Sequence, residues 1–158
     1  ESVYEVAIGF SSELDGWPVI GPGGKAYVHM TPEGNVTTQK IYRKIPQNVI
    51  AKLTEKDIKT PDEALQEVVK KENIKLDDHH MVRHEFGYFY WGKNSIQNII
   101  APHYVFFFEP ANEHYETRTY YIVSAVKGEY AKLVNDDYQL EVMRKMNQIK
   151  NIKPEEEK

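Results

Sequence analysis

The densest group of potential metal ligands in the sequence comprises three histidines and three carboxylates within nine positions: Asp77, Asp78, His79, His80, His84 and Glu85. Such a group could coordinate a first-row metal ion and activate a water molecule. Residues 80–84 have the composition of a strand, in which His80 and His84 share a face but lie about 13 Å apart. Metal–ligand bonds are only about 2.0–2.2 Å long, so His103 or His114 would have to complete a site. A solvated turn is the simpler interpretation, and we predict no metal site.

Other catalytic patterns are equally incomplete. Gly21-Pro22-Gly23-Gly24 lacks the lysine and hydroxyl residue of a phosphate-binding loop, and a strand pattern follows it rather than a helix. The adjacent carboxylates at 77–78, 136–137 and 155–157 fall in expected turns or in the tail, and no serine stands in a Gly-x-Ser-x-Gly motif. The chain has no cysteine, which removes thiolate catalysis and disulfides. The sequence therefore predicts neither catalytic residues nor a cofactor.

Aromatic residues are the most unusual feature, with 11 Tyr, 6 Phe and 2 Trp. In residues 86–91 and 104–108 both faces of a predicted strand carry rings. One set of rings is expected to fill the core, and the other is either covered or exposed as a platform for a peptide or a sugar. The candidate binding residues on such a platform are Tyr88, Tyr90, Trp91, Tyr104 and Tyr120.

The elements that would position these rings follow from local patterns. Strands are predicted at 3–10, 80–91, 104–109 and 117–126, with a β-hairpin over 25–43. Thr60-Pro61-Asp62-Glu63 has the pattern of a capping box and predicts a helix that ends near Glu72–Asn73. A second helix is predicted over 137–151, and residues 46–58 fit either a short helix or an extended link. The order predicts an α+β fold, in which helices pack on one face of a curved antiparallel sheet.

Composition narrows the class of protein. A chain of 158 residues with 41% hydrophobic and 28% charged residues suits one globular domain. The net charge of −4, without a basic cluster, argues against nucleic acid as a partner. No apolar run is long enough to span a membrane, so we expect membrane contact only through a segment outside this sequence.

Six segments, taken in order, resemble the PepSY and thermolysin-propeptide-like superfamily. Residues 14–28 resemble its hairpin, 32–36 the turn that closes the hairpin, 60–65 its helix start, and 85–90, 101–106 and 121–129 its later succession of motifs. In this sequence they read LDGWPVIGPGGKAYV, PEGNV, TPDEAL, EFGYFY, APHYVF and YIVSAVKGE. The last set also resembles extracytoplasmic regulators of a bacterial cell-wall sensor kinase. The resemblance implies a cystatin-like domain over residues 1–130. The family pattern does not include the residues after it, where helical spacing and composition predict a helical extension over 131–151 and a disordered tail over 152–158.

Relatives in that superfamily inhibit or chaperone peptidases, or modulate membrane signalling, through protein contacts and without shared catalytic residues. The resemblance therefore implies a non-catalytic regulatory domain, secreted or in the cell envelope, whose partner is a peptidase or a signalling protein. We expect binding through sheet-edge pairing and an aromatic surface. The alternatives are a module that binds polysaccharide or peptidoglycan on its Tyr/Trp face and, third, a metal-dependent enzyme.

Overall fold

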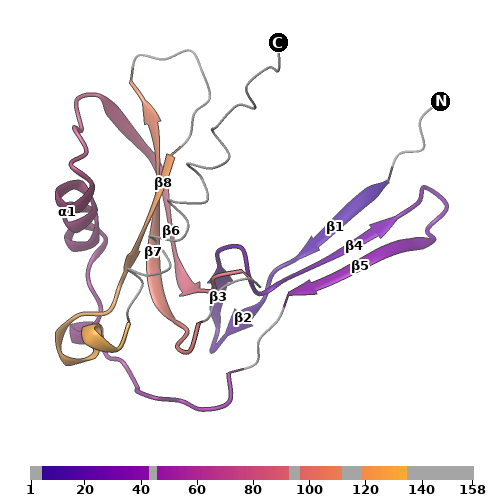
Figure 1. Cartoon of the computed structure of the whole chain (residues 1–158), viewed down its shortest axis with the longest axis horizontal. Coiled ribbons are helices and arrows are strands. Elements are labelled where there is room, and N and C mark those ends of the chain that lie inside the picture. Colours follow the sequence, from indigo (N-terminus) through magenta and orange to yellow (C-terminus); the bar gives the residue numbers. More distant parts are fainter. Residues whose placement is uncertain (1–4, 43–45, 93–96, 112–118, 135–158) are drawn as a thin grey trace, which may run out of the picture.

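The computed structural model describes residues 5–42, 46–92, 97–111 and 119–134, and these residues form two sheets (Figure 1). One sheet has the strand order β1-β4-β5 and is called the arm; its strands are β1 (Val6–Phe10), β4 (Lys25–Met30) and β5 (Val36–Tyr42). The other has the order β2-β3-β6-β7-β8; its strands are β2 (Glu13–Leu14), β3 (Trp17–Ile20), β6 (His79–Phe89), β7 (Ala101–Pro110) and β8 (Thr119–Ser124). This second sheet and helix α1 (Pro61–Glu72) form the body. The described residues also form two short 3-10 helices, η1 (Glu55–Asp57) and η2 (Gly128–Leu133).

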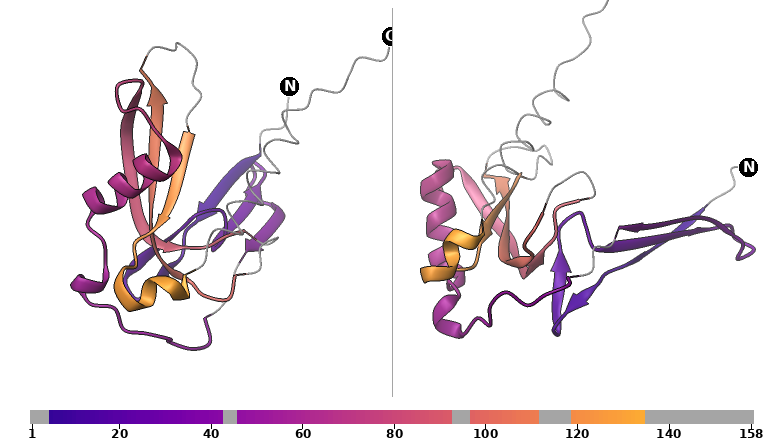
Figure 2. Two further views of the ribbon diagram at one scale, coloured as in Figure 1. Left: turned by 60° about the vertical axis from the view of Figure 1, so that its left-hand side comes forward. Right: turned by 60° about the horizontal axis from the view of Figure 1, so that its bottom comes forward.

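The arm extends away from the body, as Figure 1 and the right-hand view of Figure 2 show. Both of its strand pairings are antiparallel, with Val6 opposite Met30 in one and Ala26 opposite Ile41 in the other. The predicted hairpin over 25–43 is confirmed as the β4–β5 pair. Its turn places Gly34 at φ +86°, a conformation that glycine adopts without a steric penalty.

The body differs in one respect from the predicted sheet. The α+β class is confirmed, but the prediction of one antiparallel sheet is wrong, because the strands divide between two sheets and β3 pairs with β6 in parallel. The division occurs at residues 21–24, where Gly21 and Gly24 have φ angles of +92° and +65°. This glycine-rich loop ends β3 in the body and redirects the chain into β4 of the arm. The predicted helix over 137–151 and the predicted tail over 152–158 lie outside the described residues.

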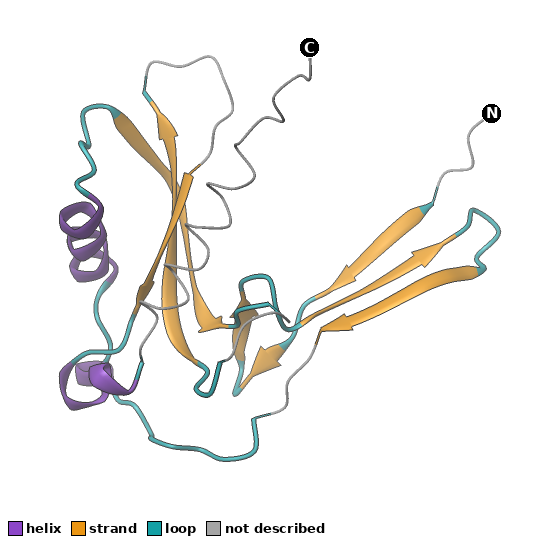
Figure 3. Ribbon diagram, in the orientation of Figure 1, coloured by secondary structure: helices purple, strands orange, loops and turns teal. Residues whose placement is uncertain are grey.

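Helix α1 lies against one face of the body sheet, where Figure 3 shows it as the longer purple helix beside the orange strands. Its predicted capping box is confirmed. The Glu63 amide donates to the Thr60 hydroxyl at 3.2 Å, and the Thr60 amide donates to the Glu63 carboxylate at 2.7 Å. At the other end Asn73 adopts the left-handed conformation that commonly terminates a helix. Local sequence signals thus fix both ends of this element.

The core consists of two clusters, one on each face of the body sheet. On the α1 side, Ala64 and Val68 of the helix pack with buried residues of β7 and β8, and the largest of these are Phe106 and Phe108. On the other side, Ile20, Phe89, Trp91, Val105 and Ile122 form the second cluster. Since β7 contributes to both clusters, its side chains are buried on both faces, and a nearly continuous apolar run is the pattern expected of such a strand.

Glu63 gives this region a pH-dependent contribution to stability. Its carboxylate accepts hydrogen bonds from the Lys127 ammonium, at 2.9 and 3.1 Å, and from the Thr60 amide. These bonds, that to Lys127 first, hold the pKa of Glu63 below its usual value. A depressed folded-state pKa stabilises the protein above the unfolded-state pKa of about 4.3, and this stabilisation is lost as the pH falls through the folded-state pKa.

We therefore expect Glu63→Gln to be less stable than the parent protein at neutral pH. The difference should close as the pH falls through the folded-state pKa of Glu63, because the parent then also carries an uncharged side chain there. Thermal unfolding from pH 7 down to about pH 3 measures the effect. The matched control is Glu13→Gln, which changes an exposed glutamate of β2. A difference that is independent of pH would show that the charge of Glu63 is not what stabilises the helix start.

Candidate functional site

One face of the arm is apolar and exposed. Strand side chains alternate between faces, so Val6, Ile8 and Phe10 of β1 point to the same side. Their partners in β4 are Met30, Val28 and Ala26, and directly paired residues share a face. Ile41 of β5 pairs with Ala26 and extends the same face. Four of these side chains are well exposed: Val6 at 54%, Ile8 at 40%, Phe10 at 53% and Ile41 at 68%.

The opposite face of the arm is small or polar. It carries Ala7 and Gly9 of β1, Tyr27 and His29 of β4, and Thr38 and Lys40 of β5. On this face His29 Nδ1 lies 3.4 Å from a Glu5 carboxylate oxygen. The arm is therefore an amphipathic sheet. Its polar face suits water, and its apolar face is of the kind that soluble proteins usually cover.

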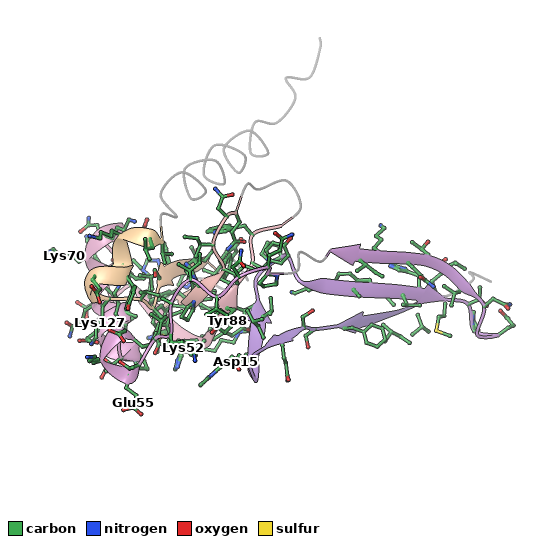
Figure 4. The ribbon with its side chains drawn as sticks, turned by 90° about the horizontal axis from the view of Figure 1, so that it is seen from below. Asp15, Lys52, Glu55, Lys70, Tyr88 and Lys127 are labelled. Carbon is green, nitrogen blue, oxygen red and sulfur yellow. The ribbon has the colours of Figure 1, made fainter. Side chains whose placement is uncertain are left out.

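No other described element covers the apolar face. Every residue of β1 is exposed, and every residue of β4 is only partly buried. Figure 4 shows the arm from below, with side chains standing on both sides of its strands and the body at one end only. A strand of alternating apolar residues normally indicates one buried face, and in the described structure this burial is missing. The face is thus a candidate surface for contact with another molecule.

The junction between arm and body is held by backbone contacts of the glycine-rich loop. The Gly23 amide donates to the Tyr90 carbonyl at 2.9 Å, and the Tyr90 amide donates to the Ile20 carbonyl at 2.9 Å. The Ser12 hydroxyl donates to the Gly24 carbonyl at 2.7 Å and ties the incoming chain to the same loop. The Gly23 amide is thus committed to a bond within the protein. This loop serves as a joint between the sheets.

Three of the five aromatic candidates lie in the interior. Tyr90 is 4% exposed, Trp91 2% and Tyr104 6%. The ring of Trp91 packs edge-on against Phe89, with ring centres 4.7 Å apart, and the Tyr104 hydroxyl donates to the Lys59 carbonyl at 3.0 Å. Burial raises the pKa of Tyr90 and of Tyr104, and the charge of Glu63 raises the pKa of Tyr104 further. These three rings stabilise the fold and do not form an exposed platform.

The other two candidates remain accessible. Tyr120 is 48% exposed in β8, and Tyr88 is half-buried in β6. Sequence reasoning missed a third ring, Trp17, which is 52% exposed and contacts Phe86 edge-on at 5.1 Å between ring centres. Phe86 in turn lies 4.9 Å from the Tyr104 ring. The only sequence signal for Trp17 was its position after the Asp15-Gly16 turn, since its packing depends on the parallel β3–β6 pairing.

The histidines do not form a metal centre in the described part of the chain. His79 Nδ1 lies 3.3 Å from the Lys75 carbonyl oxygen, His80 and His84 are exposed along β6, and His103 is buried with its Nδ1 2.8 Å from the Ala101 carbonyl oxygen. Within residues 5–42, 46–92, 97–111 and 119–134, no three His, Cys, Asp or Glu residues are grouped closely enough to hold a metal ion. His114 lies outside these ranges.

Comparisons with protein-family models, with curated proteins and with solved structures give no match for this chain. Among the described residues, no helix has the length and apolar character needed to cross a membrane.

Proposed function

We propose that this protein is a non-catalytic interaction domain, and that the apolar face of the arm binds another protein. The observation that carries this proposal is the exposure of Val6, Ile8, Phe10 and Ile41 on one face of a sheet that projects from the body. A buried apolar face would need no partner to explain it. An exposed one of this extent is typical of a contact surface.

The energetics favour a protein partner for this face. Full burial of a Val, Ile or Phe side chain contributes about 1.5–3 kcal/mol, and these four side chains are roughly half exposed. Covering them would contribute on the order of 3–6 kcal/mol before the cost of association. The strand pairings place few polar side chains on this face, among them Gln39 opposite Val28, so a sugar or a metal ion would find few groups to orient it. A complementary apolar surface of another protein suits it better.

The resemblance to PepSY and propeptide-like domains supports the same class of function. It favours a regulatory partner, either a peptidase or a membrane signalling protein, and a location outside the cytoplasm. The expected aromatic surface is replaced in this proposal by the aliphatic and Phe10 side chains of the arm, because three of the five candidate rings are buried.

Site-specific photocrosslinking tests the proposal. With benzoylphenylalanine in place of Phe10, in cells that naturally make the protein, we expect a discrete protein adduct identifiable by mass spectrometry. The adduct should be lost when Ile8→Glu is added, because a carboxylate at the centre of the face cannot be buried without a partner. Ile8 is 40% exposed, so this change should leave thermal stability nearly unaltered.

The matched control places the same crosslinker at Tyr120, an aromatic position of the body with similar exposure. Specific adducts at Tyr120 and none at Phe10 would overturn the arm as the binding surface and favour the aromatic platform instead. Adducts of equal yield at both positions would indicate nonspecific contact.

A second candidate function is carbohydrate binding through the exposed ring of Trp17, which packs edge-on against the Phe86 ring. Exposed tryptophan rings suit the apolar faces of sugars as well as peptides. Titration with soluble cell-wall glycans, followed by tryptophan fluorescence in the parent and in Trp17→Phe, separates this function from the first. A saturable change in the parent alone would support it.

A further inference from the structure

We propose that the free edge of β1 pairs with β1 of a second copy of the chain, so that two arms form one six-stranded antiparallel sheet. The inference concerns the strand edge rather than the apolar face. It rests on the proposed function only in that pairing widens the face argued above to bind a partner.

The two edges of the arm differ in how they oppose strand addition. Natural sheets protect their edges with charged side chains, proline, bulges or very short strands. β5 carries Lys40, and its pairing with β4 is interrupted by a bulge at His29 and Met30. β1 has none of these features: it pairs with β4 without interruption over five residues, and all five are uncharged and exposed. Within the described residues, no strand pairs with its outer edge.

Two-fold symmetry makes β1 complementary to itself. When the two-fold axis between the copies is perpendicular to the sheet, the numbers of two directly opposed residues always add to the same even number. Even-numbered residues of one β1 strand therefore lie opposite even-numbered residues of the other. Val6, Ile8 and Phe10 of one copy then meet the same three residues of the other, on the same face. Ala7 and Gly9 meet on the opposite face, where neither is bulky. The longest overlap centres on Ile8, with Val6 opposite Phe10 and Ala7 opposite Gly9.

Charge and area also favour a second copy. No charged side chain lies between Val6 and Phe10, and in this register Glu5 lies opposite Ser11, so no like charges are opposed. One three-stranded arm has a footprint of roughly 250 Å², from strand spacings of about 4.8 Å and rises of about 3.3 Å. Pairing doubles this footprint to about 500 Å², which is closer to the area of about 800 Å² that a stable interface buries on each partner.

The absence of cysteine from the chain allows a direct test by disulfide trapping. Ile8→Cys places two thiols opposite each other, within the Cα separation of about 4.4–6.8 Å that a disulfide requires. Under mild oxidation of the purified chain we expect a covalent dimer at least about ten times faster than for Ala7→Cys alone, whose two thiols lie two residues out of register. Sedimentation of the parent chain at up to about 100 μM should show a reversible dimer.

A mixed experiment distinguishes edge pairing from stacking of the two apolar faces. A mixture of Ala7→Cys and Gly9→Cys chains should form a disulfide between the two variants, because these positions are paired across the edge. Stacked apolar faces would hold them apart on the outer sides. Gly9→Cys is a mild change, since an added Cβ lies 3.5 Å from the nearest atom of Tyr27, which is ordinary contact.

Three outcomes would overturn the inference: a chain that stays monomeric at about 100 μM, a dimer in which Ile8→Cys reacts no faster than Ala7→Cys, or a failure of the mixed pair to crosslink. Capture of a strand from a different protein at β1, with the chain itself monomeric, would likewise assign the edge to that partner. If β1 does not form the dimer, the proposed function still stands, provided that crosslinking at Phe10 in cells gives adducts that Ile8→Glu abolishes. Loss of both results would remove the arm as a binding element.

Discussion

Replacing Phe108 with alanine is expected to lower the free energy of unfolding by about 3–5 kcal/mol. The Phe108 side chain is fully buried in β7, and its ring contacts Tyr121 edge-on with ring centres 5.6 Å apart. It belongs to the cluster that joins α1 to the body sheet. Removing the ring loses both its transfer from water and its packing, because the helix and two strands cannot close over the space. Urea unfolding followed by far-UV circular dichroism measures the change.

The arm provides the matched control for this variant. Phe10→Ala removes the same ring from a site that is 53% exposed, so it should cost less than about 1 kcal/mol. Comparable losses at the two positions would show that the apolar face of the arm is buried in solution. That result would also contradict the proposed binding surface.

A second large effect is expected at the joint between the sheets. Gly21→Ala should destabilise the protein by about 2–4 kcal/mol, from two separate causes. Gly21 has φ +92°, where a residue with a Cβ is strained. In addition, the new Cβ would lie 2.8 Å from the Phe89 ring and 2.9 Å from the Tyr90 carbonyl oxygen. The carbonyl belongs to the backbone that holds the loop, so the contact cannot be relieved by rotating a side chain.

Gly16→Ala separates the two causes. Gly16 has a similarly positive φ of +76°, in the turn between β2 and β3, but an added Cβ there meets no atom within 4 Å. It should therefore show only the conformational cost of about 1–2 kcal/mol. Thermal unfolding of both variants measures the difference. Equal destabilisation would mean that the loop moves away from Phe89 freely, and the joint would then not be rigid.

Local signals in the sequence predict much of the secondary structure. Pro61 at the helix start, with a capping pair on either side of it, defines α1 within one turn, and alternation over 25–43 defines the β4–β5 hairpin. The partition of the strands into two sheets is not local. Val19 pairs with Tyr88, far along the chain, and the sequence around either residue does not indicate its partner. Pattern alone therefore gives the elements and their class but not this pairing.

The candidate site was harder to predict for a related reason. The alternation of Val6, Ile8 and Phe10 indicates that one face of the strand is apolar. The same pattern is expected whether that face packs on the protein's own core or binds a partner. The rings of Trp91 and Tyr104 suit a binding surface, but the same rings suit a core equally well. Only the placement of the arm away from the body distinguishes the two cases. The glycine-rich loop at residues 21–24 marks where the chain turns, but the local sequence does not indicate that the arm then lies away from the body.

The parallel pairing of β3 with β6 has a consequence for biosynthesis. The ribosome makes the chain from its N-terminus onward. Because the β4–β5 hairpin needs only neighbouring residues, the hairpin can form early and fast. β3 must wait until residues 88 and 89 have been made, because these are its partners. During that interval the arm presents its unpaired β1 edge on a nascent chain that has no body. We expect aggregation on overexpression to begin at this stage of synthesis, so slower translation at lower temperature should improve the yield of folded protein.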